Sequence, residues 1–243
     1  MWGTTEAATD GDRPMTNDTT HAPIDGVIFD MDGLLLDSET LAMEAMEAAG
    51  RSMGYDMPLS FCRRMIGIPA DQCRQLVRDT FGEDAPVEGL FEAQEVALRA
   101  MVDAGRLVTK EGVVPLLDYL DAERMPRAIA TSSSRYRADH HLGLVGLLER
   151  FDVIVTRDDV TRGKPDPEPY LLAASKIGVA PAQCLALEDS PSGARAAQAA
   201  AIRTIVVPDL ISAPDDVRAR ALFVLDDLHG ALDYLKDVRA RAR

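Results

Sequence analysis

The sequence predicts an α/β fold, with a parallel sheet covered by helices on both faces and an all-helical segment inserted after the first strand. Two observations predict it. From about residue 112 onward, short apolar runs alternate with stretches of helical periodicity, which is typical of buried parallel strands joined by helices. An earlier apolar run, residues 25–29, is followed by residues 38–106, which show helical patterns and no convincing strand.

Each expected element follows from its local pattern of apolar residues. Strands are expected at residues 25–29, 127–131, 152–155, 184–187 and 203–207, with 222–225 as a further candidate. Helices are expected at residues 112–120, 135–142, 167–177 and 192–201, and within the insertion at 39–49, 70–80 and 88–104. We therefore expect a core of residues 23–37 and 107–243 and a helical cap of residues 38–106. Residues 1–22 offer little to bury and are expected to be a disordered tail.

Composition limits the possible partners. The 243 residues include 26 Lys and Arg against 40 Asp and Glu, a formal charge of −14. This acidic balance argues against a nucleic-acid partner and against adhesion to an anionic membrane. No apolar run approaches the ~20 residues of a membrane span. A phosphorylated ligand would therefore need a metal and a few local basic residues.

The cysteines indicate a reducing compartment. Cys62, Cys73 and Cys184 are odd in number and form no C-x-x-C motif, so we expect free thiols in a cytoplasmic protein. Cys184 lies in an apolar run and is expected in the core. The sequence does not determine the oligomeric state, and a monomer is compatible with it.

The first chemically informative cluster is Asp30-Met31-Asp32-Gly33, directly after the first expected strand. Residues two apart in an extended chain point the same way, so both carboxylates face one side at the strand's carboxyl end, where open α/β sheets bind ligands. One carboxylate could attack phosphorus or hold a cation, and the other could transfer a proton. Gly33 permits a sharp turn and could leave its amide open to an anion. An Asp-rich turn without function would look the same.

A second acidic cluster, Glu188-Asp189-Ser190, follows the expected strand at 184–187. If these acids meet Asp30 and Asp32 in one cleft, their repulsion requires a hard cation, and oxygen ligands suit Mg²⁺. The alternative is that Asp189 or Ser190 caps the following helix. That alternative needs one polar residue and leaves the second acid unexplained.

Lys164 precedes an expected helix start, with Asp166 as N-cap and Pro167 at the first helical position. A cation is unfavourable near a helix N-terminus, so Lys164 is better explained if it faces a phosphate or a nucleophilic carboxylate. A solvated loop lysine is the alternative.

Hydroxyl side chains, Thr131-Ser132-Ser133-Ser134, end the expected strand at 127–131. They could hold phosphate oxygens, although a serine-rich turn is the usual meaning of such a run.

Taken together and in this chain order, the four clusters resemble the haloacid dehalogenase superfamily, in particular its branch with a helical cap, which includes β-phosphoglucomutase and many sugar-phosphate phosphatases. The resemblance covers about residues 24–230 and implies a Rossmann-like core. The first motif with Asp37-Ser38-Glu39, and the motif Glu188-Asp189-Ser190-Pro191-Ser192-Gly193, carry it most specifically.

The resemblance also implies residue roles. Asp30 would be the nucleophile and a metal ligand, and Asp32 the general acid and base, with its backbone carbonyl on the metal. Glu188 and Asp189 would complete an Mg²⁺ site, and Lys164 would neutralise charge. Ser132, with Thr131 as the alternative, would bind the transferring phosphoryl group, helped by the amide of Ser133. The implied reaction is hydrolysis of a small phosphorylated metabolite through an aspartyl-phosphate.

Three alternatives share the fold. A phosphosugar mutase would carry a cap arginine shortly after a glycine like Gly67, but Ala70 stands near that position, although Arg63, Arg64 and Arg74 lie nearby in sequence. Arg99 falls where a second basic cap residue occurs, and is a candidate substrate contact. A metal-independent haloacid dehalogenase would not need Asp32 or the acid pair. A non-catalytic binding module would be expected to lack Asp30, Asp32 or the acid pair, and all of these are present.

The cap would close over the site if its two connections act as hinges. These connections are residues 34–38 and 105–112, and the glycines in the second can absorb backbone rotation.

Overall fold

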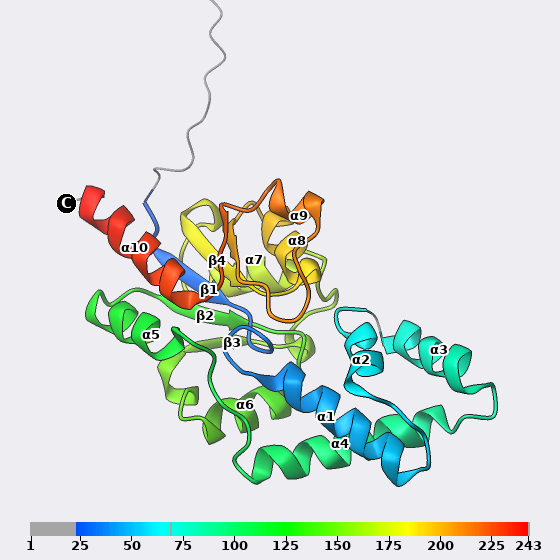
Figure 1. The fold of residues 1–243 in the computed structure, drawn as a ribbon. Coiled ribbons are helices and arrows are strands. Elements are labelled where there is room, and N and C mark those ends of the chain that lie inside the picture. Colours follow the sequence, from blue (N-terminus) through cyan, green and yellow to red (C-terminus); the bar gives the residue numbers. More distant parts are fainter. Residues whose placement is uncertain (1–22, 69, 243) are drawn as a thin grey trace, which may run out of the picture.

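The computed structural model describes residues 23–68 and 70–242. Within them, six strands form one parallel sheet in the order β3-β2-β1-β4-β5-β6 (Figure 1). The strands are β1 Gly26–Phe29, β2 Arg127–Ala130, β3 Val153–Val155, β4 Cys184–Glu188, β5 Arg203–Val206 and β6 Phe223–Val224. All six coincide with strands expected from the sequence, so the α/β fold with a parallel sheet is confirmed.

Helices cover both faces of this sheet. The helices of the core are α5 Val113–Ala122, α6 Arg135–Leu144, α7 Glu168–Lys176, α8 Pro191–Ala199, α9 Asp215–Arg218 and α10 Leu228–Ala242. Short 3₁₀ turns lie at Leu148–Arg150, Arg157–Asp159 and Pro181–Gln183. Alternate residues of β1 serve the two faces: Val27 and Phe29 pack with α5, α6 and α10, whereas Ile28 packs with α7 and α8. Apolar residues on both faces explain the continuous apolar runs in the sequence.

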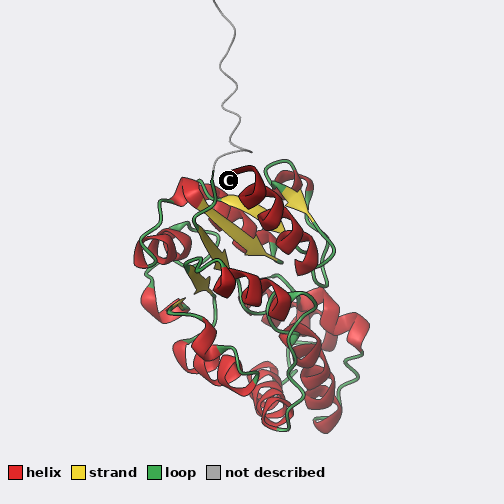
Figure 2. Ribbon diagram, turned by 90° about the vertical axis from the view of Figure 1, so that its left-hand side faces the viewer, coloured by secondary structure: helices red, strands yellow, loops and turns green. Residues whose placement is uncertain are grey.

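The insertion is helical, as the sequence predicts. Its helices are α1 Ser38–Ser52, α2 Leu59–Cys62, α3 Ala70–Phe81 and α4 Val87–Asp103, with a 3₁₀ turn at Arg63–Met65. Figure 2 shows this helical unit lying below the sheet. It has its own apolar cluster, which includes Met46, Phe61 and Leu90. Leu210, from the loop after β5, packs against that cluster, so the unit touches the core at a second place besides its connections. The division into core and cap stays a prediction.

The two connections of the insertion run side by side. Leu36 and Thr109 form an antiparallel bridge, and the amide of Asp37 donates to the carbonyl of Val108 at 3.0 Å. Gly105 has a positive φ of 76° with open space around it. Gly112 differs, because a Cβ there would lie 2.6 Å from the backbone nitrogen of His229. Gly112 is therefore required for close packing against α10, and the hinge role of this segment stays a prediction.

Sequence reasoning missed some local structure. It gave no helix for α10, although Leu228, Ala231, Leu232 and Leu235 are buried at helical spacing. It also placed the start of α7 one residue early. Pro167 occupies the N-cap position, and the Asp166 side chain accepts from the amide of Glu168 at 3.0 Å.

The three cysteines are free and buried, and Cys184 lies in the core as expected. The expectation for residues 1–22 falls outside the described residues. Among the described residues, no helix is long and apolar enough to cross a membrane.

Candidate active site

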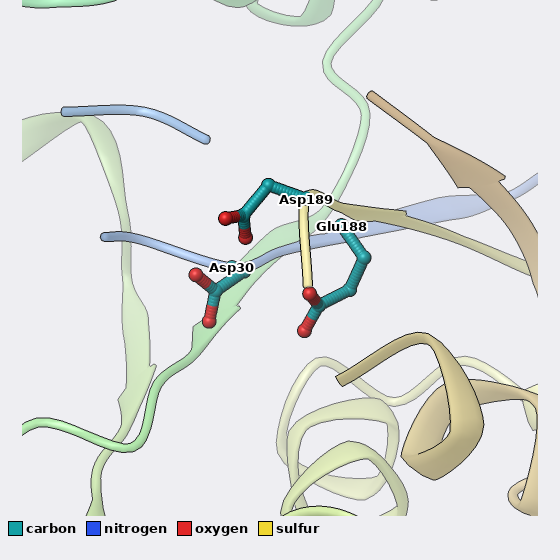
Figure 3. Close-up of side chains that lie close together, drawn as sticks. All are labelled: Asp30, Glu188 and Asp189. Atoms are coloured by element: carbon teal, nitrogen blue, oxygen red, sulfur yellow. The ribbon is translucent and has the colours of Figure 1, made fainter. Parts of the chain in front are cut away.

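The acidic residues meet where the strand order reverses. β1 pairs with β2 on one side and with β4 on the other, and Phe29 lies opposite Leu187 in the register. The next residues, Asp30 and Glu188, therefore emerge side by side at the carboxyl ends of the two central strands. This is the position at which open α/β sheets bind ligands. Figure 3 shows their carboxylates together with that of Asp189.

Lys164 joins two of these acids. Its ammonium group donates to Oδ1 of Asp30 and, at 2.5 Å, to Oε1 of Glu188. The Lys164 side chain is only 4% exposed, so the ion pairs lie out of bulk water, where charge-assisted hydrogen bonds are strongest. The expectation that Lys164 faces the proposed nucleophile agrees with this geometry, and the solvated-loop alternative is wrong.

Glu188 is held from several directions. The hydroxyl of Tyr170 donates to its Oε1 at 2.7 Å, and the amide and hydroxyl of Ser190 donate to its Oε2 at 3.1 and 3.0 Å. Both Glu188 and Tyr170 are completely buried. A buried carboxylate with this many donors keeps a single orientation. Ser190 is at the same time the N-cap of α8, accepting from the amide of Gly193 at 3.1 Å, so the helix-cap interpretation is confirmed and the metal-site interpretation stays a prediction.

Two glycines let the acid pair pack against the backbone. A Cβ at Gly193 would lie 1.7 Å from Oε1 of Glu188, and a Cβ at Gly33 would lie 2.3 Å from Oδ2 of Asp189. Gly33 also has a positive φ of 84°. The expectation that the Gly33 amide is open to an anion is wrong, because it donates to the carbonyl of Leu36 at 2.9 Å. Gly33 serves the close approach of Asp189 instead.

Burial and mutual repulsion dominate the electrostatics. Burial, followed by the Glu188 and Asp32 charges, raises the pKa of Asp30 to about 8, although Lys164 opposes the rise. Burial and the neighbouring Asp30 and Glu188 charges raise the pKa of Asp189 well above its usual value. Burial alone would lower the pKa of Lys164, but the Asp30 and Glu188 carboxylates outweigh it and raise that pKa. Three carboxylates thus share one ammonium group, which leaves negative charge uncompensated.

The same cluster fits a divalent cation. One carboxylate oxygen each from Asp30, Glu188 and Asp189 lies within 4.8 Å of the others, and Oδ1 of Asp189 is buried without a hydrogen-bond partner. A buried unpaired carboxylate oxygen is costly, and a hard cation such as Mg²⁺ would both pair it and favour the ionised form of Asp30. The side chain of Asp32 lies outside this cluster, and the role of its carbonyl as a ligand stays a prediction.

Asp32 is oriented by two hydroxyls. Ser38 donates to its Oδ1 and Ser133 donates to its Oδ2, both at 2.7 Å. Ser38 begins α1 of the insertion and Ser133 follows β2 of the core, so this carboxylate is held between the two parts of the chain. A fixed carboxylate beside Asp30 suits proton transfer to and from a bound group.

The hydroxyl run reaches the site in a different way from the one expected. Ser133 is used by Asp32, and its amide donates to Oγ1 of Thr131 at 3.0 Å. Thr131 is buried and Ser132 is exposed, and both line the same cavity as Asp30. The choice between Thr131 and Ser132 as the phosphate-binding residue stays open, and the role of the Ser133 amide stays a prediction.

These groups line one central cavity of about 320 Å³. Of the expected residues, it is lined by Asp30, Asp32, Thr131, Ser132, Ser133, Lys164 and Asp189. Glu188 lies behind it. Sequence reasoning missed two other lining residues, Ala42 and Arg137. It identified the motifs that contain four more but gave these residues no role: Ser38, Glu39, Ser190 and Ser192. Burial, then the charges of Asp209 and Asp32, raises the pKa of Glu39 to about 7.

Two sizeable cavities border the central cavity. The cap cavity, about 210 Å³, shares Glu39 and Ala42 with it and is otherwise lined mainly by apolar and sulfur side chains: Met43, Met46, Cys62, Met65, Ile66, Gly67, Cys73, Phe91 and Gln94. The α4–α6 cavity, about 340 Å³, shares Ser132, Ser133 and Arg137 with it. Arg99 lines the α4–α6 cavity and lies over the ring of Tyr136, so the structure places it beside the central cavity and outside its wall.

The missed contacts have physical reasons. Tyr170 reaches Glu188 across 18 positions of sequence, and its apolar neighbours in α7 identify it only as a core residue. Arg137 lies in a helix with charges at many positions, where an isolated arginine carries no signal. Glu39 is different, because the sequence analysis had already identified its motif, Asp37-Ser38-Glu39.

Comparisons with a family model, with related sequences and with solved structures all point to the same family of proteins. The family model described as haloacid dehalogenase-like hydrolase matches residues 27–207. A validoxylamine A 7'-phosphate phosphatase from Streptomyces hygroscopicus subsp. limoneus is 37% identical, over 72% of this chain and 81% of its own length. A phosphorylated carbohydrates phosphatase from Thermotoga maritima is 34% identical, over 75% of this chain and 84% of its own length. A putative β-phosphoglucomutase structure from Thermotoga maritima has a TM-score of 0.76 at 30% identity, over 88% of this chain and all of that one.

Proposed function

The chain belongs to the haloacid dehalogenase-like hydrolase family and is a phosphatase, and from that premise we propose that it hydrolyses a small phosphorylated sugar through an aspartyl-phosphate intermediate. One observation carries the mechanism. A carboxylate fixed by a buried lysine, Asp30, lines the same cavity as a second carboxylate fixed by two hydroxyls, Asp32. This arrangement supports a division of roles between a nucleophile and a proton carrier.

In the first step, a carboxylate oxygen of Asp30 attacks phosphorus, and the bond from phosphorus to the sugar oxygen breaks. Asp32, in its protonated form, gives its proton to that leaving oxygen. In the second step, Asp32 removes a proton from a water molecule, whose oxygen attacks the phosphorus, and the bond from phosphorus to the Asp30 oxygen breaks. The products are the free alcohol and inorganic phosphate, and both aspartates return to their starting forms.

Lys164 holds one oxygen of Asp30 and so orients the nucleophile, and it offsets charge that develops on the phosphoryl group. Glu188 and Tyr170 in turn hold the lysine end of this network. Asp30, Glu188, Asp189 and the carbonyl of Asp32 would hold Mg²⁺. Bound there, Mg²⁺ would supply positive charge that polarises the phosphoryl oxygens and favours in-line attack.

A phosphosugar mutase is the second candidate, because the structurally similar protein from Thermotoga maritima is titled a putative β-phosphoglucomutase. The part of the cap next to Gly67, where a mutase arginine was expected, supports hydrolysis instead. Gly67 lines the cap cavity, and the residues that line this cavity, all within the described part of the chain, include no Lys, Arg or His. Arg74 donates to Glu88 and Arg64 lies over the ring of Phe61, and neither lines that cavity.

The test is turnover of a panel of sugar phosphates with Mg²⁺, followed both by release of inorganic phosphate and by chromatography of the sugar product. Release of phosphate in proportion to the free sugar is expected. Conversion of a hexose 1-phosphate to its 6-phosphate without phosphate release would identify a mutase. No turnover of any phosphorylated sugar, alongside turnover of other phosphate esters, would overturn the proposed substrate class.

A further inference from the structure

The α4–α6 cavity differs from its surroundings in charge. Although the chain carries a net charge of −14, this cavity is lined by two arginines, Arg99 and Arg137, and two histidines, His140 and His141. Its one acidic lining residue, Glu95, is exposed. Two guanidinium groups lining one cavity of a strongly acidic protein produce a local field that attracts anions.

Arg137 connects this cavity to the chemistry. Its side chain lines both the α4–α6 cavity and the central cavity, and so do Ser132 and Ser133. The two cavities therefore meet along a shared wall, with the proposed nucleophile on one side. A molecule whose phosphate reaches Asp30 can extend past Arg137 into the second space.

The guanidinium group of Arg137 is available at this wall. Glu95 lies 3.9 Å from its Nη1, which is too long for a hydrogen bond. Its Nε atom is buried without a hydrogen bond, but the side chain as a whole is 30% exposed. The terminal nitrogens can therefore donate to an anion that enters either cavity.

The cap cavity offers the contrast. It borders the central cavity at Glu39 and Ala42 and is lined mainly by methionine, isoleucine, phenylalanine and cysteine side chains. An anionic group would lose hydration there without gaining a cation. Of these two cavities, the α4–α6 cavity is therefore the favourable position for a substrate's second charge.

We propose that the α4–α6 cavity is a second anion-binding subsite in which Arg137, supported by Arg99, binds a carboxylate or second phosphate at the far end of the substrate. This inference rests on the proposed phosphatase function and narrows its substrate class to phosphorylated sugars with a second negative charge. A planar guanidinium suits both anions, since each accepts two parallel hydrogen bonds. Arg137 is thus a specificity-determining residue.

The test compares three open-chain compounds that share a six-carbon skeleton and one phosphate. Sorbitol 6-phosphate ends in a neutral alcohol, 6-phosphogluconate ends in a carboxylate, and sorbitol 1,6-bisphosphate ends in a second phosphate. The measured quantity is the ratio of kcat/KM for each charged compound to that for sorbitol 6-phosphate. At least one ratio is expected to exceed 10 in the wild type, and which one does so identifies the anion.

Arg137→Gln is expected to lower that ratio by on the order of 10- to 100-fold, the usual effect of losing a hydrogen-bonded charge pair. Arg137→Lys, which keeps the charge, should lose less. The matched control is Arg135→Gln, on the same helix, because Arg135 pairs with Asp159 and lines neither cavity. An unchanged ratio in Arg137→Gln, or an equal fall in Arg135→Gln, would overturn the subsite.

A binding measurement separates this inference from the proposed function. In the Asp30→Asn variant, calorimetry should show that the preferred charged compound binds at least 10-fold more tightly than sorbitol 6-phosphate. Adding Arg137→Gln should remove the difference. If none of the compounds is hydrolysed but this preference holds, the proposed reaction fails and the subsite stands. Equal binding of all three compounds would overturn the subsite alone.

Discussion

The strand-end cluster, made of Asp30, Lys164, Tyr170, Glu188 and Asp189, and the cap cavity border the same space but are built differently. In the cluster, charged groups are buried, and hydrogen bonds join Lys164 to Asp30 and Glu188, and Tyr170 to Glu188. The cap cavity is lined by flexible thioethers and apolar side chains with few directional contacts. A fixed polar network suits a single reaction, whereas methionine-rich surfaces adapt to different shapes. The cluster should therefore control the rate of chemistry, and the cap cavity the choice of substrate.

The largest effect is expected at Asp30. Asp30→Asn keeps the shape of the side chain and removes the nucleophile, so kcat should fall by on the order of 10⁴-fold or more. Rapid quenching and mass spectrometry should detect a phosphorylated wild-type chain and no phosphorylated variant. A variant that retains both phosphoenzyme and turnover would show that another residue is attacked, and the contrast between cluster and cap would lose its basis.

Metal removal should have a comparable effect. Because Asp189 has an unpaired buried oxygen among three carboxylates, EDTA should abolish turnover and added Mg²⁺ should restore it. Binding to the native state also stabilises it, so Mg²⁺ should raise the Tm of the wild type by about 5 °C or more. The shift should vanish in Asp189→Asn. Full activity in metal-free buffer would rule this site out.

Asp32→Asn tests the proton carrier. The expected loss in kcat is about 10²- to 10⁴-fold for sugar phosphates, whose alkoxide leaving groups need a proton. The loss should be much smaller for formation of the phosphoenzyme from p-nitrophenyl phosphate, because nitrophenolate leaves without protonation. Pre-steady-state measurement of the first p-nitrophenol released separates this step from the second. Equal losses for both substrates would count against Asp32 as the acid.

Tyr170→Phe removes one hydrogen bond from Glu188 and leaves the ring in place. A buried hydrogen bond to a charged group contributes about 1.5–3 kcal/mol, so kcat should fall roughly 10-fold as Glu188 and Lys164 lose their fixed positions. KM should change little. Because a smaller fraction of folded enzyme would also lower the apparent kcat at constant KM, kcat is to be normalised to the folded fraction measured by circular dichroism. Tyr55→Phe, which removes a hydroxyl within the cap, should leave kcat unchanged. A Tyr170 variant with wild-type kcat would show that the tyrosine only fills the core.

The smallest effect is expected in the cap cavity. Ile66→Ala removes apolar surface from its wall and should raise KM about 3- to 10-fold for sugar phosphates, with kcat nearly unchanged. Acetyl phosphate, too small to reach the cap, should be unaffected. Val96→Ala is the control, since Val96 is an exposed residue of α4 that lines none of the three cavities. A large fall in kcat for Ile66→Ala would mean that the cap also positions the reacting groups.

The same contrast explains what the sequence could predict. The six strands were predictable because both faces of the sheet are buried, so each strand is a short apolar run with a polar residue at its end. Asp30, Glu188 and Asp189 were recognisable because they stand at those ends within local motifs, and Lys164 because it precedes a recognisable helix start. The structure brings all four together, and their catalytic and metal roles stay predictions.

Residues whose contacts are distant in sequence were not predictable in this way. Tyr170 looks like any buried aromatic residue until its hydroxyl is placed beside Glu188. Arg137 acquires a meaning only from two cavities that meet at its side chain. The amide of Gly33 looked free, but a turn that closes onto Leu36 uses it.

The close approach of Gly33 to Asp189 and of Gly193 to Glu188 has a consequence for how this sequence can diverge. Each acid occupies the volume that a β-carbon would need, so neither glycine can be replaced while its acid keeps this position. This holds for Gly33 and Asp189, which are far apart in sequence, and for Gly193 and Glu188, which are close. Glycines with open space around them, such as Gly82 and Gly146, carry no such linkage. Keeping the two acids, Asp189 and Glu188, therefore also requires keeping Gly33 and Gly193, although neither glycine takes part in the reaction.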